Sequence, residues 1–577
     1  MVLFVLTLVC SQALLTVMTT SGPVTGVLNG QIASWKGIPF ATPPVGSLRW
    51  TAPSPPPPWT SSFDASKFGP ACQQHNASGY VFPVGLNFSE DCLTLNVWAP
   101  VGAADSGVLL DVMVWIYGGA FVNGGSAQLM YDGSYFASQN VIFVSLNYRL
   151  GYFGFLALNE LSGPANGAFG FLDQQLALQW VQENIGAFGG DKFKVTLFGE
   201  SAGACSTTLH ITTPSSWKYF QRAIVQSAPS YAEVRPVAES IQLGNRLTRR
   251  LGCDDSPNVL SCMRSIPGND SRLNQNTSSF PIAAVSFGGV VPLHPYIAIQ
   301  NRVIFPGPLM GGNVLNEGSL FVYSVPLSIF TESFYRFVFP GVFAQAFRIS
   351  LQDAFLAVAR YPCHTYNASD CRAAAAALVG DFLLQCPTMQ ILLERSKMSE
   401  PVFAYMFAHQ PSFSAFPNLG VYHSSELEFV FGTYPKAAAT QQEVVLSRDM
   451  SASWIAFAKF SDPSTFAQGL WTPFGSSLSR RFLDVGPWTN VAWQSRNCSF
   501  WFNEVFPKYY SALSAAPIVE CAADFQLCDS NARFCCTIGF ECKRHVVSSM
   551  CSGTSSSADK EEFRCVGQPI VAVLLSQ

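Results

Sequence analysis

One short segment constrains the fold more than any other: a predicted strand that runs into Gly199-Glu-Ser-Ala-Gly203. Residues 193–198, Phe-Lys-Val-Thr-Leu-Phe, predict a buried strand, and the apolar spacing from Ala202 onward predicts a helix. Glycines on both sides of a strand-to-helix turn permit a tight backbone in which the central residue is strained and its side chain exposed. This arrangement is typical of a nucleophile elbow, so Ser201 is the candidate nucleophile.

Further predicted strands and a helix precede this turn in the sequence. Residues 109–117 predict a buried strand that ends at Gly118-Gly119, and residues 141–147 predict another. Residues 173–185 predict a helix with an acidic start. Because strands alternate with helices, we expect an α/β fold with a mostly parallel central sheet and helices on both faces. The Phe-rich region 280–350 gives no clear element pattern.

A serine hydroxyl becomes a good nucleophile only when a neighbouring base takes its proton. In folds with this elbow the chain order is serine, acid, histidine, which excludes histidines before Ser201. His210 would lie on the helix after the elbow and is expected to be structural. His423 lies in a loop of small residues and could reach across a site. From the residues alone, His423 remains in competition with His409 and His364.

The negative charge that develops on an attacked ester needs backbone N–H donors. One donor should come from Ala202, directly after the serine, and others from a glycine-rich loop after an earlier strand. Tyr117-Gly-Gly-Ala-Phe121 is such a loop. We expect neither a metal nor a cofactor.

Composition excludes some partners. The formal net charge is −4, which gives no electrostatic reason to bind nucleic acid. Hydrophobic residues make up 49% of the chain and charged residues only 12%. No internal run of about 18 uncharged apolar residues is present, so we expect no transmembrane segment.

The N-terminus predicts export from the cell. Residues 1–13 contain a short apolar run followed by Ser-x-Ala, which indicates a signal peptide; a buried first strand is the alternative. Glycosylation sequons add to the case for a secreted glycoprotein. The sequons begin at Asn76, Asn87, Asn269, Asn276, Asn367 and Asn497.

The cysteines indicate an oxidising compartment rather than a zinc site. The spacing allows loops closed by Cys72–Cys92, Cys253–Cys262, Cys363–Cys371 and Cys386–Cys498. Cys205 lies four residues after Ser201 and is expected to be a structural thiol.

The C-terminal residues 516–577 hold a second group of cysteines and predict a small module, separate from a catalytic domain at 14–515. The first six have spacing that resembles inhibitor cystine-knot mini-domains, which disulfides hold together. Cys565 is left over, and it either links two subunits as a homodimer or takes part in a different pairing within the module. Binding of the module to a polysaccharide or a surface is a further hypothesis. The cysteines are Cys521, Cys528, Cys535, Cys536, Cys542, Cys551 and Cys565.

Several motifs occur in an order that resembles the type-B carboxylesterase and cholinesterase family, over roughly residues 15–510. The match is specific because the motifs are independent of one another. They are Gly37-Ile-Pro-Phe-Ala-Thr-Pro-Pro-Val-Gly46, Glu90-Asp-Cys-Leu-Thr-Leu-Asn-Val-Trp-Ala-Pro100, Asn147-Tyr-Arg-Leu-Gly-Tyr-Phe-Gly-Phe155, Phe198-Gly-Glu-Ser-Ala-Gly203, Gly312-Asn-Val-Leu-Asn-Glu317 and Gly420-Val-Tyr-His423.

The resemblance implies an α/β-hydrolase fold and completes the site. It makes Glu317 the acid that orients the histidine, and it favours His423 over its rivals. It assigns the oxyanion amides to Gly119, Ala120 and Ala202, where Ala120 replaces a usual glycine and its methyl group could narrow the acyl site. It further implies Ser227, Glu200 and Glu426 beside the triad, the ion pairs Arg49–Glu90 and Arg149–Asp173, and the disulfides Cys72–Cys92, Cys253–Cys262 and Cys386–Cys498.

The chain departs from true cholinesterases in its aromatic residues. No tryptophan lies between Cys72 and Cys92, where Tyr80, Phe82 and Phe88 are the aromatic residues, and none follows Ser227 closely. Since a quaternary ammonium gains most from a tryptophan face, acetylcholine is not the expected substrate.

The sequence therefore predicts a secreted serine hydrolase that cleaves carboxylic esters through an acyl-enzyme. A lipase acting on long-chain acylglycerols or sterol esters is the alternative within enzymes, because the Phe-rich region 280–350 could form an apolar lid or acyl tunnel. A non-catalytic adhesion protein on the same fold is the alternative from another class.

Overall fold

The computed structural model describes most of the chain between residues 15 and 510. The described ranges are 15–74, 86–229, 234–273, 285–323, 325–367, 369–475, 478–493, 496–510, 518–521 and 526–529. The predicted signal peptide, residues 1–13, lies outside them, as do Tyr80, Phe82 and all but two short strands of the cysteine-rich module, β18 (Ile518–Cys521) and β19 (Gln526–Asp529).

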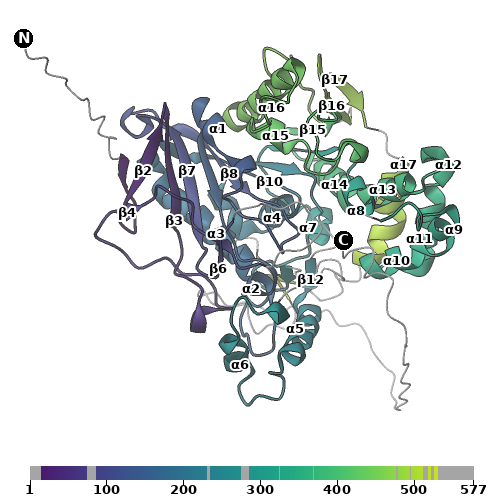
Figure 1. Ribbon diagram of the computed structural model, residues 1–577, viewed down its shortest axis with the longest axis horizontal. Coiled ribbons are helices and arrows are strands. Elements are labelled where there is room, and N and C mark those ends of the chain that lie inside the picture. The colour runs from purple at the N-terminus through teal and green to yellow at the C-terminus, as the bar shows by residue number, and fades with distance from the viewer. Residues whose placement is uncertain are drawn as a thin grey trace, which may run out of the picture.

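A thirteen-stranded mixed sheet forms the centre of the described fold (Figure 1). Its seven middle strands run parallel to one another. In spatial order they are β9 (Ile142–Leu146), β8 (Leu110–Ile116), β10 (Gly190–Glu200), β11 (Arg222–Gln226), β14 (Leu309–Val314), β15 (Val402–Phe407) and β16 (Ser479–Leu483). Antiparallel strands extend the two edges: β1 (Leu15–Met18), β2 (Pro23–Asn29), β3 (Ile32–Pro39) and β7 (Thr94–Pro100) at one, β17 (Thr489–Ala492) at the other. The short strands are β4 (Phe63–Asp64), β5 (Ala71–Cys72), β6 (Phe88–Ser89), β12 (Val234–Pro236) and β13 (Val285–Phe287).

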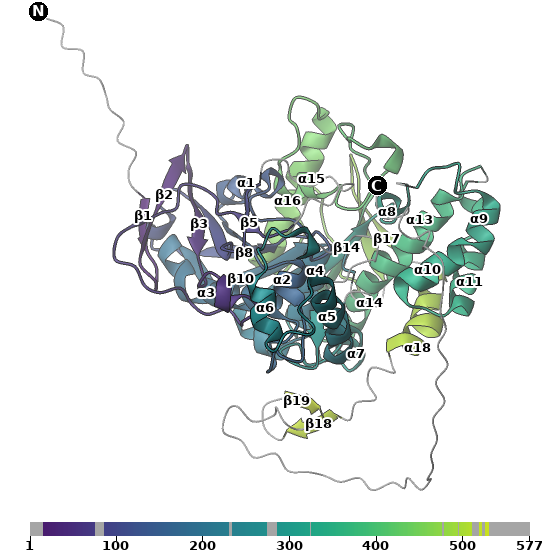
Figure 2. The same ribbon diagram turned by 60° about the horizontal axis from the view of Figure 1, so that its bottom comes forward.

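Helices cover both faces of this sheet, as expected for an α/β fold. In both views α1 and α16 lie on one side, and α3 and α4 on the other (Figures 1 and 2). The helices are α1 (Ser134–Ser138), α2 (Gly151–Phe155), α3 (Phe169–Asn184), α4 (Ala202–Ile211), α5 (Val237–Leu251), α6 (Val259–Ser265), α7 (Pro295–Gln300), α8 (Ser319–Val322), α9 (Glu332–Phe337), α10 (Phe339–Phe347), α11 (Leu351–Arg360), α12 (Cys363–Tyr366), α13 (Arg372–Gly380), α14 (Cys386–Arg395), α15 (Leu427–Phe431), α16 (Gln441–Phe460), α17 (Arg496–Phe500) and α18 (Phe506–Tyr510).

The three strands predicted before the elbow are present as β8, β9 and β10, but the start predicted for the helix over 173–185 is too late. This helix is α3, which starts at Phe169 and ends at Asn184. Asp173 therefore lies inside the helix and is not part of its N-terminal turn. Its buried carboxylate instead accepts two hydrogen bonds from the guanidinium of Arg149, at 2.8 and 2.7 Å. Asp173 is therefore a partner in an ion pair and not the residue at which the helix begins.

The Phe-rich region contributes largely to the core. Phe330, Phe339 and Phe343 are buried and belong to the main hydrophobic cluster, whereas Phe337 on α9 is exposed. Burial of the first three in the core accounts for part of the high phenylalanine content of this region.

One helix among the described residues, Arg372–Arg395, is long and apolar enough to cross a membrane by length and composition alone. It joins α13, a π-helical turn at Asp381–Gln385, and α14. Asp381 interrupts the run of about 18 uncharged apolar residues that a transmembrane segment needs. Because 78% of its most apolar window is buried within the fold, this helix is part of the core.

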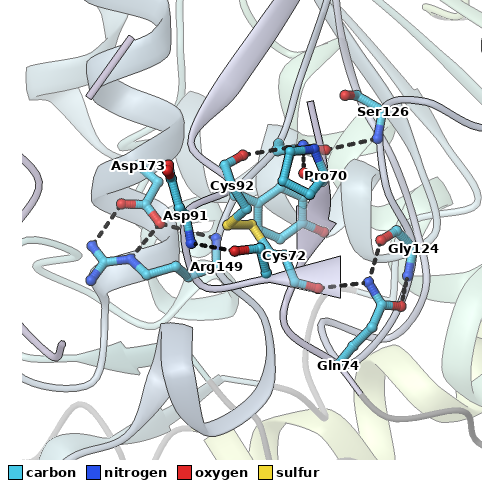
Figure 3. Close-up of a disulfide and its surroundings, with 12 residues drawn as sticks. Pro70, Cys72, Gln74, Asp91, Cys92, Gly124, Ser126, Arg149 and Asp173 are labelled. Atoms are coloured by element: carbon cyan, nitrogen blue, oxygen red, sulfur yellow. Dashed lines mark hydrogen bonds and ion pairs between the residues drawn. A yellow bond between two sulfur atoms is a disulfide. The ribbon is translucent and has the colours of Figure 1, made fainter. Parts of the chain in front are cut away.

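Four disulfides lie within the described residues: Cys72–Cys92, Cys253–Cys262, Cys363–Cys371 and Cys386–Cys498. Figure 3 shows the first of them, with the Arg149–Asp173 ion pair beside it. Gln74, two residues after Cys72, donates a hydrogen bond to the Gly124 carbonyl at 2.7 Å and accepts one from the Gly124 N–H at 2.8 Å. The disulfide loop is thus attached to the segment that follows β8. Cys205, on α4, is a buried thiol.

Loss of Cys386–Cys498 should destabilise the protein more than loss of Cys363–Cys371. The first bond spans 112 residues and the second only 8. Because the entropy of an open chain rises with loop length, the double substitution Cys386→Ala/Cys498→Ala should cost about 2 kcal/mol more free energy of unfolding than Cys363→Ala/Cys371→Ala. Urea unfolding of both variants measures this difference. Equal losses would mean that native contacts, and not loop closure, decide the contribution of each bond.

Candidate active site

The turn at Ser201 has the strained geometry that the sequence predicted. Ser201 stands between β10 and α4 with φ 57° and ψ −125°, and its N–H donates to the Gln226 carbonyl at 3.0 Å. A β-carbon on Gly203 would lie 2.0 Å from the Ile116 carbonyl oxygen, and one on Gly199 would lie 2.7 Å from the same oxygen. Both glycines are therefore needed for α4 to begin directly against the end of β8. The close packing holds the serine in a conformation that is unfavourable for a residue with a side chain.

Glu317, three residues after β14, is fixed by several donors. One carboxylate oxygen, Oε1, accepts hydrogen bonds from Ser227 Oγ at 2.5 Å, Asn313 Nδ2 at 2.9 Å and the Val314 N–H at 3.1 Å. The other, Oε2, accepts from His423 Nδ1 at 2.7 Å. Glu317 and His423 are both buried. The carboxylate thus holds the imidazole with its proton on Nδ1 and leaves Nε2 as the basic nitrogen.

His423 Nε2 is buried and makes no hydrogen bond to any described residue, Ser201 included. It lies 3.1 Å from Glu200 Oε1, a contact without hydrogen-bond geometry. That carboxylate oxygen is bound instead by the Ser424 hydroxyl at 2.6 Å. The structure therefore brings His423 and Glu317 together, and it places Glu200 against the basic nitrogen. The bond from Ser201 to His423 is the one interaction of the predicted triad that is absent.

The charges around His423 determine its protonation. Burial alone would lower its pKa, but the carboxylates of Glu200 and Glu317 outweigh burial and raise the pKa of His423 to about 9. Burial raises the pKa of the Glu200 carboxyl. Burial, together with the charge of Glu200, raises the pKa of Glu426 to about 8. Glu426 Oε1 accepts a hydrogen bond from Gln226 at 3.1 Å. This carboxyl therefore lies at the end of β11, the strand next to β10.

The other candidate histidines have different surroundings. His409 lies between Asp484 and Glu443, at 3.0 and 3.1 Å. His364 is exposed on α12. His210 is buried on α4, where burial lowers its pKa to about 3. Of the three histidines that the residues alone left open as the base, His423 is the one bound to Glu317.

The glycine-rich loop lies directly beside the serine. A β-carbon on Gly118 would come within 3.0 Å of Ser201 Cβ. The next residues have positive φ angles of 117° at Gly119 and 52° at Ala120, so the alanine adopts a left-handed conformation that glycine would enter more easily. In the described part of the chain no acceptor is bound to the N–H groups of Gly119, Ala120 or Ala202. These amides are available to a ligand next to Ser201.

Asn313 also fixes the acid, and the sequence did not point to it. Asn313 donates to Glu317 Oε1 and lies four residues before it, at the end of β14. The motif from Gly312 to Glu317 contains this asparagine, but nothing in its spacing showed that the amide would face the carboxylate. The structure also places Ser227 against Glu317 and Glu200 against His423.

The serine lies in a strained strand-to-helix turn of a mostly parallel sheet, and a carboxylate-bound histidine comes from a later turn. This arrangement defines the α/β-hydrolase fold class. The chain belongs to the carboxylesterase family, whose model matches residues 13–501. It is therefore an ester hydrolase by family.

Two curated relatives cover nearly the same length. An acetylcholinesterase from Bungarus fasciatus is 36% identical over 540 residues, which span 86% of this chain and 87% of the relative. A cholinesterase from Mus musculus is 32% identical over 531 residues, or 85% of this chain and 86% of the relative.

Proposed function

We propose that Ser201, His423 and Glu317 form a catalytic triad that hydrolyses carboxylic esters through an acyl-enzyme. The observation that carries this proposal is the 2.7 Å hydrogen bond from His423 Nδ1 to a Glu317 carboxylate that is itself held by three donors. An acid fixed in this way maintains the one tautomer in which Nε2 can accept a proton from serine.

The reaction proceeds in two halves. His423 Nε2 takes the proton from Ser201 Oγ, which attacks the ester carbonyl and forms a tetrahedral intermediate. The amides of Gly119, Ala120 and Ala202 donate to its negatively charged oxygen. His423 then protonates the leaving alcohol, and the acyl group remains on Ser201. In the second half His423 removes a proton from water, which attacks the acyl-enzyme. The bond between the acyl group and Ser201 Oγ then breaks, His423 returns the proton to Ser201, and the acid is released.

The preferred substrates are esters of uncharged alcohols. Two relatives are cholinesterases by name, so choline esters are the second candidate. The lack of tryptophan between Cys72 and Cys92 argues against them, since a quaternary ammonium is best bound by a tryptophan face. Comparison of kcat/KM for phenyl acetate and acetylthiocholine decides between the two. Activation by an oil–water interface on long-chain esters would instead identify a lipase.

Labelling with a fluorophosphonate separates a hydrolase from an adhesion protein, because only an activated serine reacts.

We further propose that the protein is secreted and glycosylated, on the basis of the N-terminal sequence and the disulfides. The sequon residues Asn87, Asn269 and Asn367 are exposed, as glycan attachment requires. Peptide mapping of protein from a secreting cell line tests both statements.

The pH dependence of hydrolysis should shift when Glu200 is neutralised. His423 acts as a base only when neutral, so with a pKa of about 9 its activity falls as the pH drops below that value. Glu200→Gln removes a negative charge that raises this pKa, and the acidic limb of the kcat/KM profile should move to lower pH. Glu332→Gln, on exposed α9, is the control and should leave the profile unchanged. An acidic limb that stays in place in Glu200→Gln would contradict the assigned role of His423.

A further inference from the structure

A buried guanidinium with too few partners follows Ser227 in the chain. Arg235 is the central residue of β12, and only 8% of its surface is exposed. Its Nε and Nη1 are buried and have no hydrogen-bond partner among the residues that the structure describes. Burial, with smaller contributions from the charges of Arg348 and Arg246, lowers the pKa of Arg235 to about 10, so the group is still charged at neutral pH. A buried cation with unused donors is costly unless a counter-charge completes it.

One carboxylate is shared by two of these arginines. Glu239 Oε1, in the first turn of α5, lies 3.9 Å from Arg235 Nη1. This separation is too long for a hydrogen bond. The same oxygen pairs closely with Arg348 Nη1. Glu239 therefore pairs mainly with Arg348, and its interaction with Arg235 is weaker because of the longer distance.

The arginines come from three elements that meet at this point. Arg348 follows α10 with a left-handed backbone, φ 57°. Arg246 lies two helical turns after Glu239 on α5, so both side chains project from the same face of the helix. Figure 1 shows β12 and α5 below α4, with α10 to their right. With three guanidinium groups and one carboxylate, the cluster carries two excess positive charges in a chain whose net charge is −4.

We propose that Arg235, Arg246 and Arg348 form a binding site for a small oxyanion, a carboxylate or a phosphate. The planar guanidinium presents its N–H groups as a fork that matches two oxygens of such an anion. An oxyanion would supply the acceptors that Arg235 Nε and Nη1 lack. Glu239 competes with this anion, because its carboxylate pairs with Arg348 and lies 3.9 Å from Arg235.

The test uses inorganic phosphate and, separately, acetate as probes. Isothermal titration of the full chain at pH 7.5, with sodium chloride keeping the ionic strength constant, gives the Kd of each anion. Arg348→Gln and Arg246→Gln should each raise the phosphate Kd about tenfold, the effect of one lost charge-assisted hydrogen bond. Glu239→Gln should lower the Kd, because it removes the competing charge. Tighter binding of phosphate than of acetate identifies a phosphate site, and the reverse a carboxylate site.

Arg249→Gln is the matched control, since Arg249 is exposed on the same helix and its Nε donates to the Asn245 carbonyl within that helix. It should leave both Kd values unchanged. The proposal is overturned if wild-type protein binds neither anion, if Arg249→Gln weakens binding as much as Arg348→Gln, or if Glu239→Gln fails to tighten it. Hydrolysis of phenyl acetate should be equal in all four variants, because none of the residues belongs to the proposed triad.

Discussion

Ser201→Ala should reduce kcat for ester hydrolysis by about 10⁶-fold, the scale seen when a serine nucleophile is removed from a complete triad. The oxyanion amides and substrate binding would remain. The variant should therefore keep slow hydrolysis by water, about 10³–10⁴-fold above the uncatalysed rate. The fold should be unchanged, because no hydrogen bond from the Ser201 side chain to a described residue contributes to it. Its N–H bond to Gln226 is independent of the side chain.

The measurement combines hydrolysis of 4-nitrophenyl acetate with fluorophosphonate labelling and a thermal unfolding curve. Ser215→Ala, on the exposed surface after α4, is the control and should retain full activity and full labelling. An active Ser201→Ala variant with a normal unfolding curve would refute the assignment of the nucleophile.

Glu317→Gln should reduce ester hydrolysis nearly as much as Ser201→Ala. The hydrogen bonds to Glu317 explain why. Three donors, from Ser227, Asn313 and Val314, converge on Glu317 Oε1. In the variant they would fix the amide oxygen of glutamine at this position and turn its NH₂ group toward His423 Nδ1. The imidazole would then have to accept that bond and carry its proton on Nε2, where it cannot remove a proton from Ser201.

A comparable change of carboxylate to amide in a serine protease lowers kcat by about 10⁴-fold, and a similar loss is expected here with KM little changed. Ser227→Ala is the graded comparison. It removes one of the three donors and leaves the carboxylate charge, so its loss should be far smaller. A Glu317→Gln enzyme with activity within tenfold of wild type would show that the acid does not set the tautomer of His423.

The sequence predicts those features that depend on local geometry. The elbow is an example: Gly199 and Gly203 are required because a β-carbon at either would meet the end of β8, and that requirement appears as a spaced pair of glycines. The resemblance added the partners from distant segments, Glu317 and His423, which local spacing alone left undecided. The structure places these two side chains in direct contact.

Features that depend on long-range packing could not be predicted in the same way. From local spacing Asp173 looked like a helix start, and only the resemblance implied its buried ion pair with Arg149, which lies before the helix. Asn313 faces Glu317 only because of the path of the chain after β14. The three arginines around Glu239 come from β12, α5 and the end of α10, and no sequence spacing connects them.

The disulfide Cys386–Cys498 also affects how the protein would respond to a protease. The bond closes a covalent ring that contains β15, His423, α15, α16 and the fully exposed Phe466. A single cut in the surface loop around Phe466 would leave both fragments joined through sulfur. The nicked chain would keep its full mass until it is reduced, and His423 would remain tethered on the same side of the cut as Glu317.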